Sequence, residues 1–178
     1  MSDLDFEEAE RSLVNEMTLS HYSKTKVRKV HSTDQLPGKI GTYDKPKGFW
    51  VSVDGEFDWP SWCKAEDYGL ERFKWRHVVT LRPGANILRI SSKEELDKFS
   101  EEYQDPVSPT LLSPRFSGID WHRVARLYQG IIISPYIWER RLSGHASWYY
   151  IWDCASGCIW DAKAIASIKA EKYELSTV

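Results

Sequence analysis

The chain has 178 residues, of which 42% are hydrophobic and 28% charged, and its formal net charge is −2. These values predict one folded domain, and they exclude both a disordered chain and a nucleic-acid binder that works by overall positive charge. No apolar stretch approaches the roughly 18 residues of a membrane span, and the acidic start MSDLDFEEAE differs from a signal peptide. With three cysteines, an odd number, the sequence predicts a cytoplasmic protein with free thiols and no membrane contact.

The first half of the chain alternates short apolar runs with polar stretches. Asp58 precedes a helical pattern that has Pro60 near its start, which is typical of a capped helix. The elements predicted here are an acidic helix or arm over 1–17, strands over 18–22 and 49–53, a basic exposed loop over 24–43 and a helix over 59–68.

The second half mixes strands and helices without a regular strand-helix-strand rhythm. Ser92 and Glu95 form a capping-box pattern at the start of a helix. Strands are predicted over 77–81, 86–90, 131–134, 148–152 and 158–161, and helices over 91–103, 120–128 and 161–169. The whole pattern predicts an α+β fold with a small, mostly antiparallel sheet, in one domain over 18–170 with a tail over 171–178.

Aromatic residues make up 13% of the chain, and seven of its nine tryptophans fall into two groups. The first group is Trp50, Trp59 and Trp62, and the second is Trp138, Trp148, Trp152 and Trp160. Large rings most often fill a core, and this is the interpretation favoured for most of them. Some can also stack on a flat ligand or dock a partner chain.

Several common chemical signatures are missing from the sequence. There is no GxGxxG, no GxxxxGK[ST] and no GxSxG motif. Cys154 and Cys158 lie four apart, but no histidine or second cysteine pair completes a zinc site, so no metal is predicted. Cys154 with His145 allows a thiol nucleophile and its base, although a buried, inert cysteine is the more common arrangement.

Two strand segments carry candidate ligand-binding residues. His21, Tyr22 and Ser23 end the first strand and precede the basic loop, and ligand contacts concentrate at such strand ends. An imidazole can donate to a ribose hydroxyl, and a tyrosine ring can stack on a heterocycle. In GFWVS, alternation places Trp50 and Ser52 on one face. The alternative is that His21 is a core histidine with hydrogen-bonded nitrogens, and that Trp50 is a core residue while Ser52 faces the solvent.

Two acidic residues are candidates for the catalytic carboxylate. Asp153 follows WYYIW, so aromatic neighbours would partly desolvate it and suit it to charge stabilisation or base catalysis. It is equally suited to bonding the backbone of its own turn. Glu139 lies in YIWERR, where two arginines favour a solvated ion pair instead.

Taken together, LSHYS, then KPKGFWVS after a basic loop, then WDCASGCIWD resemble the H-Y-E branch of the ADP-ribosyltransferase fold. This branch includes diphtheria-toxin-like and poly-ADP-ribose-polymerase-like enzymes and small phage and toxin–antitoxin members. The resemblance spans about Leu19 to Asp161, and about a dozen positions carry it.

The resemblance implies a transferase that uses NAD as its substrate, with a role for each matching position. His21 would hold a ribose hydroxyl, and the backbone of Tyr22 would hold the nicotinamide amide. Trp50 or Ser52 would take the second-motif position, and Asp153 would be the third-motif acid. The family usually has Glu at the third position and often Tyr at the second. Both departures favour a single-transfer enzyme over a chain-building polymerase.

The resemblance also implies a macromolecular acceptor, either protein or nucleic acid, and an antitoxin or inhibitor partner if the chain is a toxin. Lys24 begins a stretch with four basic residues within the six positions 24–29, beside the expected NAD site. It is suited to the phosphates of NAD or of a nucleic acid, or to a plain solvated loop. Two other interpretations remain, a non-catalytic nucleotide- or RNA-binding module on the same fold and an aromatic-rich protein-interaction domain.

Overall fold

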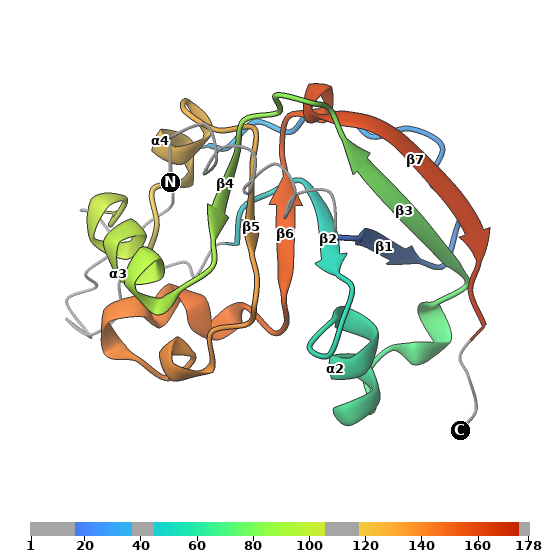
Figure 1. Cartoon of the computed structure of the whole chain (residues 1–178), viewed down its shortest axis with the longest axis horizontal. Helices are drawn as coiled ribbons and strands as arrows, with labels where there is room; N and C mark the ends of the chain where they lie inside the picture. The colour runs from blue at the N-terminus through green and yellow to red at the C-terminus, as the bar shows by residue number, and fades with distance from the viewer. Residues whose placement is uncertain (1–16, 37–44, 106–117, 175–178) are drawn as a thin grey trace, which may run out of the picture.

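The computed structural model describes residues 17–36, 45–105 and 118–174, which form one sheet with short helices around it (Figure 1). The strands are β1 (Leu19–Ser23), β2 (Phe49–Val53), β3 (Trp75–Leu81), β4 (Ile87–Ile90), β5 (Gly130–Ile133), β6 (Ser156–Ile159) and β7 (Ile165–Lys172). The helices are α2 (Trp59–Ala65), α3 (Lys93–Glu102) and α4 (Trp121–Ala125) and the 3₁₀-helices η1 (Leu70–Arg72), η2 (Trp138–Arg140), η3 (Gly144–Ile151) and η4 (Ala162–Ala164). The predicted arm over 1–17 lies outside the described residues apart from Met17.

The strand order across the sheet is β4-β5-β6-β2-β1-β3-β7, and only β4 and β5, among these described strands, are parallel neighbours. Parallel neighbours need a crossover connection, and α3 and α4 lie within it. The predicted α+β fold with a mostly antiparallel sheet is confirmed. Its weakest junction is between β1 and β2, which share two register pairs, whereas β3 and β7 share seven.

Two helices begin where their capping residues predict. The carboxylate of Asp58 accepts a hydrogen bond from the backbone N–H of Ser61, and this fixes the start of α2. In α3 the hydroxyl of Ser92 and the carboxylate of Glu95 satisfy each other's backbone N–H groups. These local hydrogen bonds satisfy the backbone donors that the first turn of a helix leaves open.

The strand predicted over 148–152 is wrong, because this segment belongs to the 3₁₀-helix η3. The strand that follows it, β6, is already paired with β2 on one side and β5 on the other. The WYYIW segment therefore cannot form a hairpin with the strand that directly follows it. As a helix, the segment buries Trp148, Tyr149 and Trp152 together, which a strand with its two opposite faces would not do.

The helix predicted over 161–169 is also wrong. Asp161 caps only the single turn of η4, and the chain then continues as β7. The β-branched residues Ile165 and Ile168 favour a strand, and the free edge of β3 provides a partner along its whole length. The strand extends to Lys172, two residues beyond the predicted domain end.

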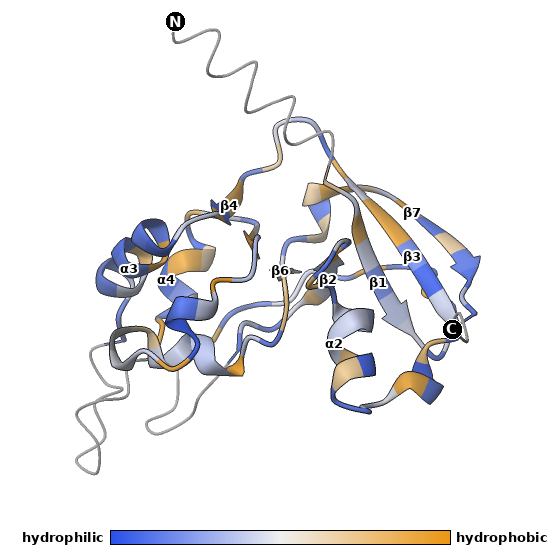
Figure 2. Ribbon diagram, turned by 60° about the horizontal axis from the view of Figure 1, so that its bottom comes forward, coloured by the Kyte–Doolittle hydropathy of each residue, from blue (hydrophilic) through white to orange (hydrophobic). Residues whose placement is uncertain are grey.

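Helices α3 and α4 lie at the opposite end of the sheet from β3 and β7 (Figures 1 and 2), and their buried residues Phe99, Tyr103 and Trp121 belong to the aromatic core. Trp121, Trp148, Trp152 and Trp160 are buried there and contact one another through their rings. The predicted ring-filled core is thus confirmed for most of the second tryptophan group, whereas Trp138 is exposed. In the part of the chain that the structure describes, no helix has the length and apolarity needed to cross a membrane.

Candidate functional site

The register of β1 and β2 decides which of the predicted site residues share a face of the sheet. Ser20 lies directly opposite Ser52, so both side chains point to one face, and alternation adds Tyr22 and Trp50 to that face. His21 points to the opposite face. The structure therefore separates the His21 side chain from those of Tyr22, Trp50 and Ser52.

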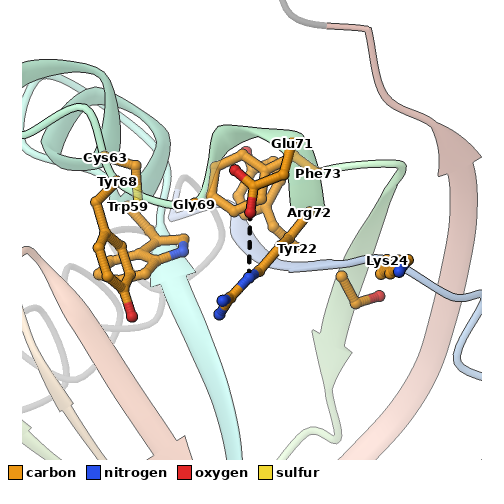
Figure 3. A pocket seen from close by; sticks show the side chains of 10 residues that line it. Tyr22, Lys24, Trp59, Cys63, Tyr68, Gly69, Glu71, Arg72 and Phe73 are labelled. Carbon is orange, nitrogen blue, oxygen red and sulfur yellow. Dashed lines mark ion pairs between the residues drawn. The ribbon is translucent and has the colours of Figure 1, made fainter.

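A pocket of about 420 Å³ opens where β1 ends (Figure 3). One wall is the end of β1, with Tyr22, Ser23 and Lys24, and a second is α2, with Trp59 and Cys63. The segment from 68 to 73, which includes η1, closes the third side. Three residues predicted to bind NAD thus lie together, while the side chains of His21, Trp50, Ser52 and Asp153 lie outside the pocket lining.

The pocket combines flat rings with cationic side chains. The Trp59 ring stacks on Trp62 at 5.0 Å between centroids, and Tyr68 meets Trp59 edge-on at 6.2 Å. Lys24 and Arg72 also line the pocket, as does Glu71, which pairs with Arg72 at 3.3 Å, and Figure 3 shows Lys24 far from the rings of Trp59 and Tyr68. Such a lining is suited to a ligand with a flat heterocycle at one end and an anionic group at the other.

The second-motif serine has a structural role. Ser52 is buried, and its hydroxyl oxygen accepts a hydrogen bond of 2.8 Å from the backbone N–H of Trp59. It therefore ties the first residue of α2 to β2 and holds the Trp59 wall of the pocket in place. Ser52 positions the site rather than facing a ligand.

His21 has a defined tautomer. Its Nδ1 lies 2.8 Å from the carbonyl oxygen of Trp50, which only accepts, so Nδ1 carries the proton and donates it. Burial lowers the pKa of His21 below its usual value of 6.5, so the ring is neutral at pH 7. Its Nε2 then presents a lone pair, and this nitrogen would accept a hydrogen bond from a ribose hydroxyl, opposite in direction to the predicted donation.

His77, to which the sequence assigned no role, lies fully buried beside His21. Its Nδ1 donates to the carbonyl oxygen of His21 at 3.1 Å, and its Nε2 accepts from the backbone N–H of Val27 at 2.9 Å. The second of these bonds holds the basic loop against this face of the sheet. His77 thereby connects the first motif to the loop that follows it.

Asp153 lies in a second group of residues, which we call the Trp50 cluster and which consists of Lys45, Trp50, Trp152 and Asp153. Lys45 Nζ is 3.4 Å from the Asp153 carboxylate and 5.3 Å from the centre of the Trp50 ring. The rings of Trp50 and Trp152 are 4.8 Å apart. The structure therefore joins the predicted second-motif ring to the predicted third-motif acid.

Cys63 connects the pocket to the Trp50 cluster. Its thiol lines the pocket, and burial raises its pKa to about 12, with a further contribution from the negative charge of Asp153. The Asp153 carboxylate is thus near enough to act electrostatically on the pocket wall.

The other chemical candidates do not gather into a site. Burial raises the pKa of Cys154 to about 12, so this thiol is not ionised at neutral pH and is a poor nucleophile. The side chain of His145 lies outside the described part of the structure. Glu139 is exposed on η2. Among the described residues no group of three or more histidine, cysteine or acidic side chains is placed to hold a metal ion.

Sequence reasoning missed several pocket residues. Tyr68 and Phe73 come more than 40 residues after the first motif, and no local pattern marks them as neighbours of Tyr22. Trp59 could be found from the sequence, since its ring belongs to the first tryptophan group.

Comparison with protein-family models, with curated proteins and with solved structures finds no match for this chain.

Proposed function

We propose that the chain is an NAD-dependent ADP-ribosyltransferase that transfers one ADP-ribose unit to a macromolecular acceptor. The observation that carries this proposal is the pocket at the end of β1. It is lined by Tyr22 and Ser23, from the first motif of the resemblance, by Lys24, which follows them, and by the rings of Trp59 and Tyr68. Stacking on rings and charge-assisted hydrogen bonds to cations are what a nicotinamide nucleotide requires.

In the proposed reaction the bond between C1′ of the ribose and the nicotinamide nitrogen breaks. Nicotinamide leaves with both bonding electrons, and positive charge develops on the ribose. A nitrogen or oxygen nucleophile of the acceptor then bonds to C1′ and releases its proton to water. The electrons balance without a redox partner, and the barrier falls wherever a carboxylate stabilises the ribose charge.

Several side chains have a place in this scheme. Lys24 and Arg72, which line the pocket, bind the phosphates, whereas His21 points to the opposite face of the sheet and does not contact a ligand in this pocket. Asp153 supplies the carboxylate, with Trp50 beside it to exclude water. In the free protein Lys45 neutralises Asp153, and the ribose cation takes over this pairing as the nicotinamide bond breaks.

The ion pair between Lys45 and Asp153 also favours a second candidate function. A carboxylate that stays paired with an ammonium group stabilises a ribose cation poorly. The same pocket would then belong to a non-catalytic nucleotide-binding module.

The experiment measures nicotinamide release from NAD together with the thermal shift that NAD produces. We expect Asp153→Asn to lower release by about 100-fold or more, because a transition-state charge loses its partner, while the thermal shift persists. Asp153→Glu should keep part of the activity, since it retains a carboxylate. Glu139→Gln is the matched control, an acid-to-amide change at an exposed residue, and should match the wild type.

Three outcomes separate the candidates. Release that is unchanged in Asp153→Asn would contradict the role of this carboxylate. A thermal shift without any release would support the binding module. The absence of both would remove NAD from consideration and leave an aromatic-rich interaction domain.

A further inference from the structure

A tryptophan flanked by two lysines lies near the pocket, at the start of β3. Lys172 Nζ is 4.6 Å from the centre of the Trp75 ring, and Lys26 Nζ is 5.5 Å from it. Two ammonium groups on one ring repel each other, so the arrangement is stabilised when an anion joins it. The proposed NAD site makes no use of these three residues.

The sheet and the basic loop together build this surface. Trp75 lies opposite Ser23 of β1 and opposite Lys172 of β7, so these side chains share one face. Val27 is tied to the same face by its hydrogen bond to His77. Lys26, although distant from Lys172 in sequence, is therefore held beside it by the fold.

The basic stretch of this surface carries positive charges only. The stretch from Lys24 to His31 contains four lysines and arginines and no acidic residue. All four are exposed, and none forms an ion pair with another described residue. Glu171, the neighbour of Lys172, points to the opposite face and is bound by Arg76. A chain of net charge −2 thus carries a local basic surface around an aromatic ring.

We propose that this surface, formed by Trp75, Lys26 and Lys172 and adjoined by the rest of the basic stretch over 24–29, binds a single-stranded nucleic acid, which is the ADP-ribose acceptor. Proteins bind single strands by combining spaced cations for phosphates with rings on which bases stack. Phosphates draw the two ammonium groups off the Trp75 ring, and a base then covers it. An acidic peptide would use the lysines but would leave the ring without a partner.

The surface and the pocket meet at the end of β1, because Ser23 lines the pocket and lies opposite Trp75 in the neighbouring strand. A strand that is bound at Trp75 and crosses this end of β1 would reach the pocket, where the proposed reaction would present C1′ of the ribose. The binding step stands by itself, whereas the identity of the acceptor rests on the proposed function. A binding assay without NAD therefore separates failure of this inference from failure of the transferase proposal.

The test measures the fluorescence anisotropy of labelled 12-nucleotide probes, dT12 and rU12, over a range of salt concentrations. The double variant Lys26→Gln/Lys172→Gln should weaken binding and reduce the magnitude of the log–log salt slope by about 1.4, since each phosphate contact contributes about 0.7. Trp75→Leu should weaken binding about tenfold through lost stacking. The matched control, Lys98→Gln/Lys163→Gln, removes two exposed lysines elsewhere and should bind as the wild type does.

Every outcome decides the proposal. Probe binding that falls in the two test variants but not in the control supports it, and the comparison of dT12 with rU12 identifies DNA or RNA. Absent binding, or an equal loss in the control, overturns it. Competition by polyglutamate as effective as that by unlabelled dT12 also overturns it, because charge alone would then explain binding. Nicotinamide release without any acceptor should be unchanged in the double-lysine variant.

Discussion

Tryptophan has different roles at the two ends of the sheet, the end beside α3 and α4 and the end near β1 and β3. Beside α3 and α4, Trp148 donates its indole N–H to Ser100 and Trp160 donates to the carbonyl of Tyr128, and both rings are buried. Near the end of β1, Trp59 is only half-buried and lines a pocket, and Trp75 is flanked by lysines. A buried ring whose polar atom is satisfied is a core residue, whereas a half-exposed ring beside cations is available to a ligand.

The strongest test of this contrast replaces one tryptophan from each end. Trp148→Ala should lower the free energy of unfolding by about 4 kcal/mol, because it leaves a large cavity in the core. Trp59→Ala should cost much less, about 1 kcal/mol, since part of its ring is already in contact with water. Urea denaturation measures both values, and similar losses in the two variants would refute the contrast.

The same pair of variants separates stability from ligand binding. Trp59→Ala should reduce the thermal shift that NAD produces, because a wall of the pocket is removed. Trp148→Ala, if enough folded protein remains, should melt at a lower temperature than the wild type but show the same shift when NAD is added.

A second test concerns the ion pairs near the pocket. Arg76 joins three strands, since it bonds Asp54 after β2 at 2.6 Å, Ser20 in β1 at 3.0 Å and Glu171 in β7 at 2.8 Å. Arg76→Met should therefore lower the free energy of unfolding by about 2 kcal/mol. Arg76→Lys should recover only part of this, because an ammonium group lacks the fork of the guanidinium.

Arg72 provides the matched control for this prediction. It pairs with Glu71 at 3.3 Å, but both side chains are more than 60% exposed. Arg72→Met should change the free energy of unfolding by less than about 0.5 kcal/mol in the same urea experiment. A loss equal to that of Arg76→Met would show that the number of strands an arginine joins does not determine its contribution to the free energy of unfolding.

The contrast also shows which features the sequence could reveal. Asp58 and Ser92 act on backbone groups within a few residues, so their helices were predictable from local pattern. Whether WYYIW is a strand depended on the two neighbours that already occupy β6, and that information lies far away in the chain.

The candidate site divides in the same manner. Tyr22, Ser23 and Lys24 were found because they are consecutive, and they do line one pocket. His21 lies in the same run, but alternation turns its side chain to the face opposite Tyr22, whereas Ser23, the last residue of β1, lines the pocket at the end of the strand. Phe73, whose ring centre lies 5.4 Å from that of Tyr22, comes close to it only through the fold, so no local signal could have identified it.

The smallest predicted effect concerns the pH dependence of stability on the His21 side of the sheet. Burial lowers the pKa of His21 in the folded protein, so the unfolded chain binds its proton more readily. Stability is therefore complete above pH 6.5 and falls as the pH drops below that value, by at most about 1.4 kcal/mol per pH unit for one group. His21→Asn should flatten this decline in urea denaturation between pH 7.5 and 5.

His77 lies beside His21 and is left unchanged in this comparison. Its two nitrogens form hydrogen bonds with the carbonyl oxygen of His21 and the backbone N–H of Val27, so replacing it would disturb the structure itself. The control is therefore His31→Asn, a change at an exposed residue, which should keep the wild-type curve. A curve for His21→Asn that is as steep as the wild type would mean that another buried group causes the decline. If the curve flattens as expected, then the face opposite the pocket holds a neutral imidazole at pH 7, which is the state in which its Nε2 accepts a hydroxyl hydrogen bond.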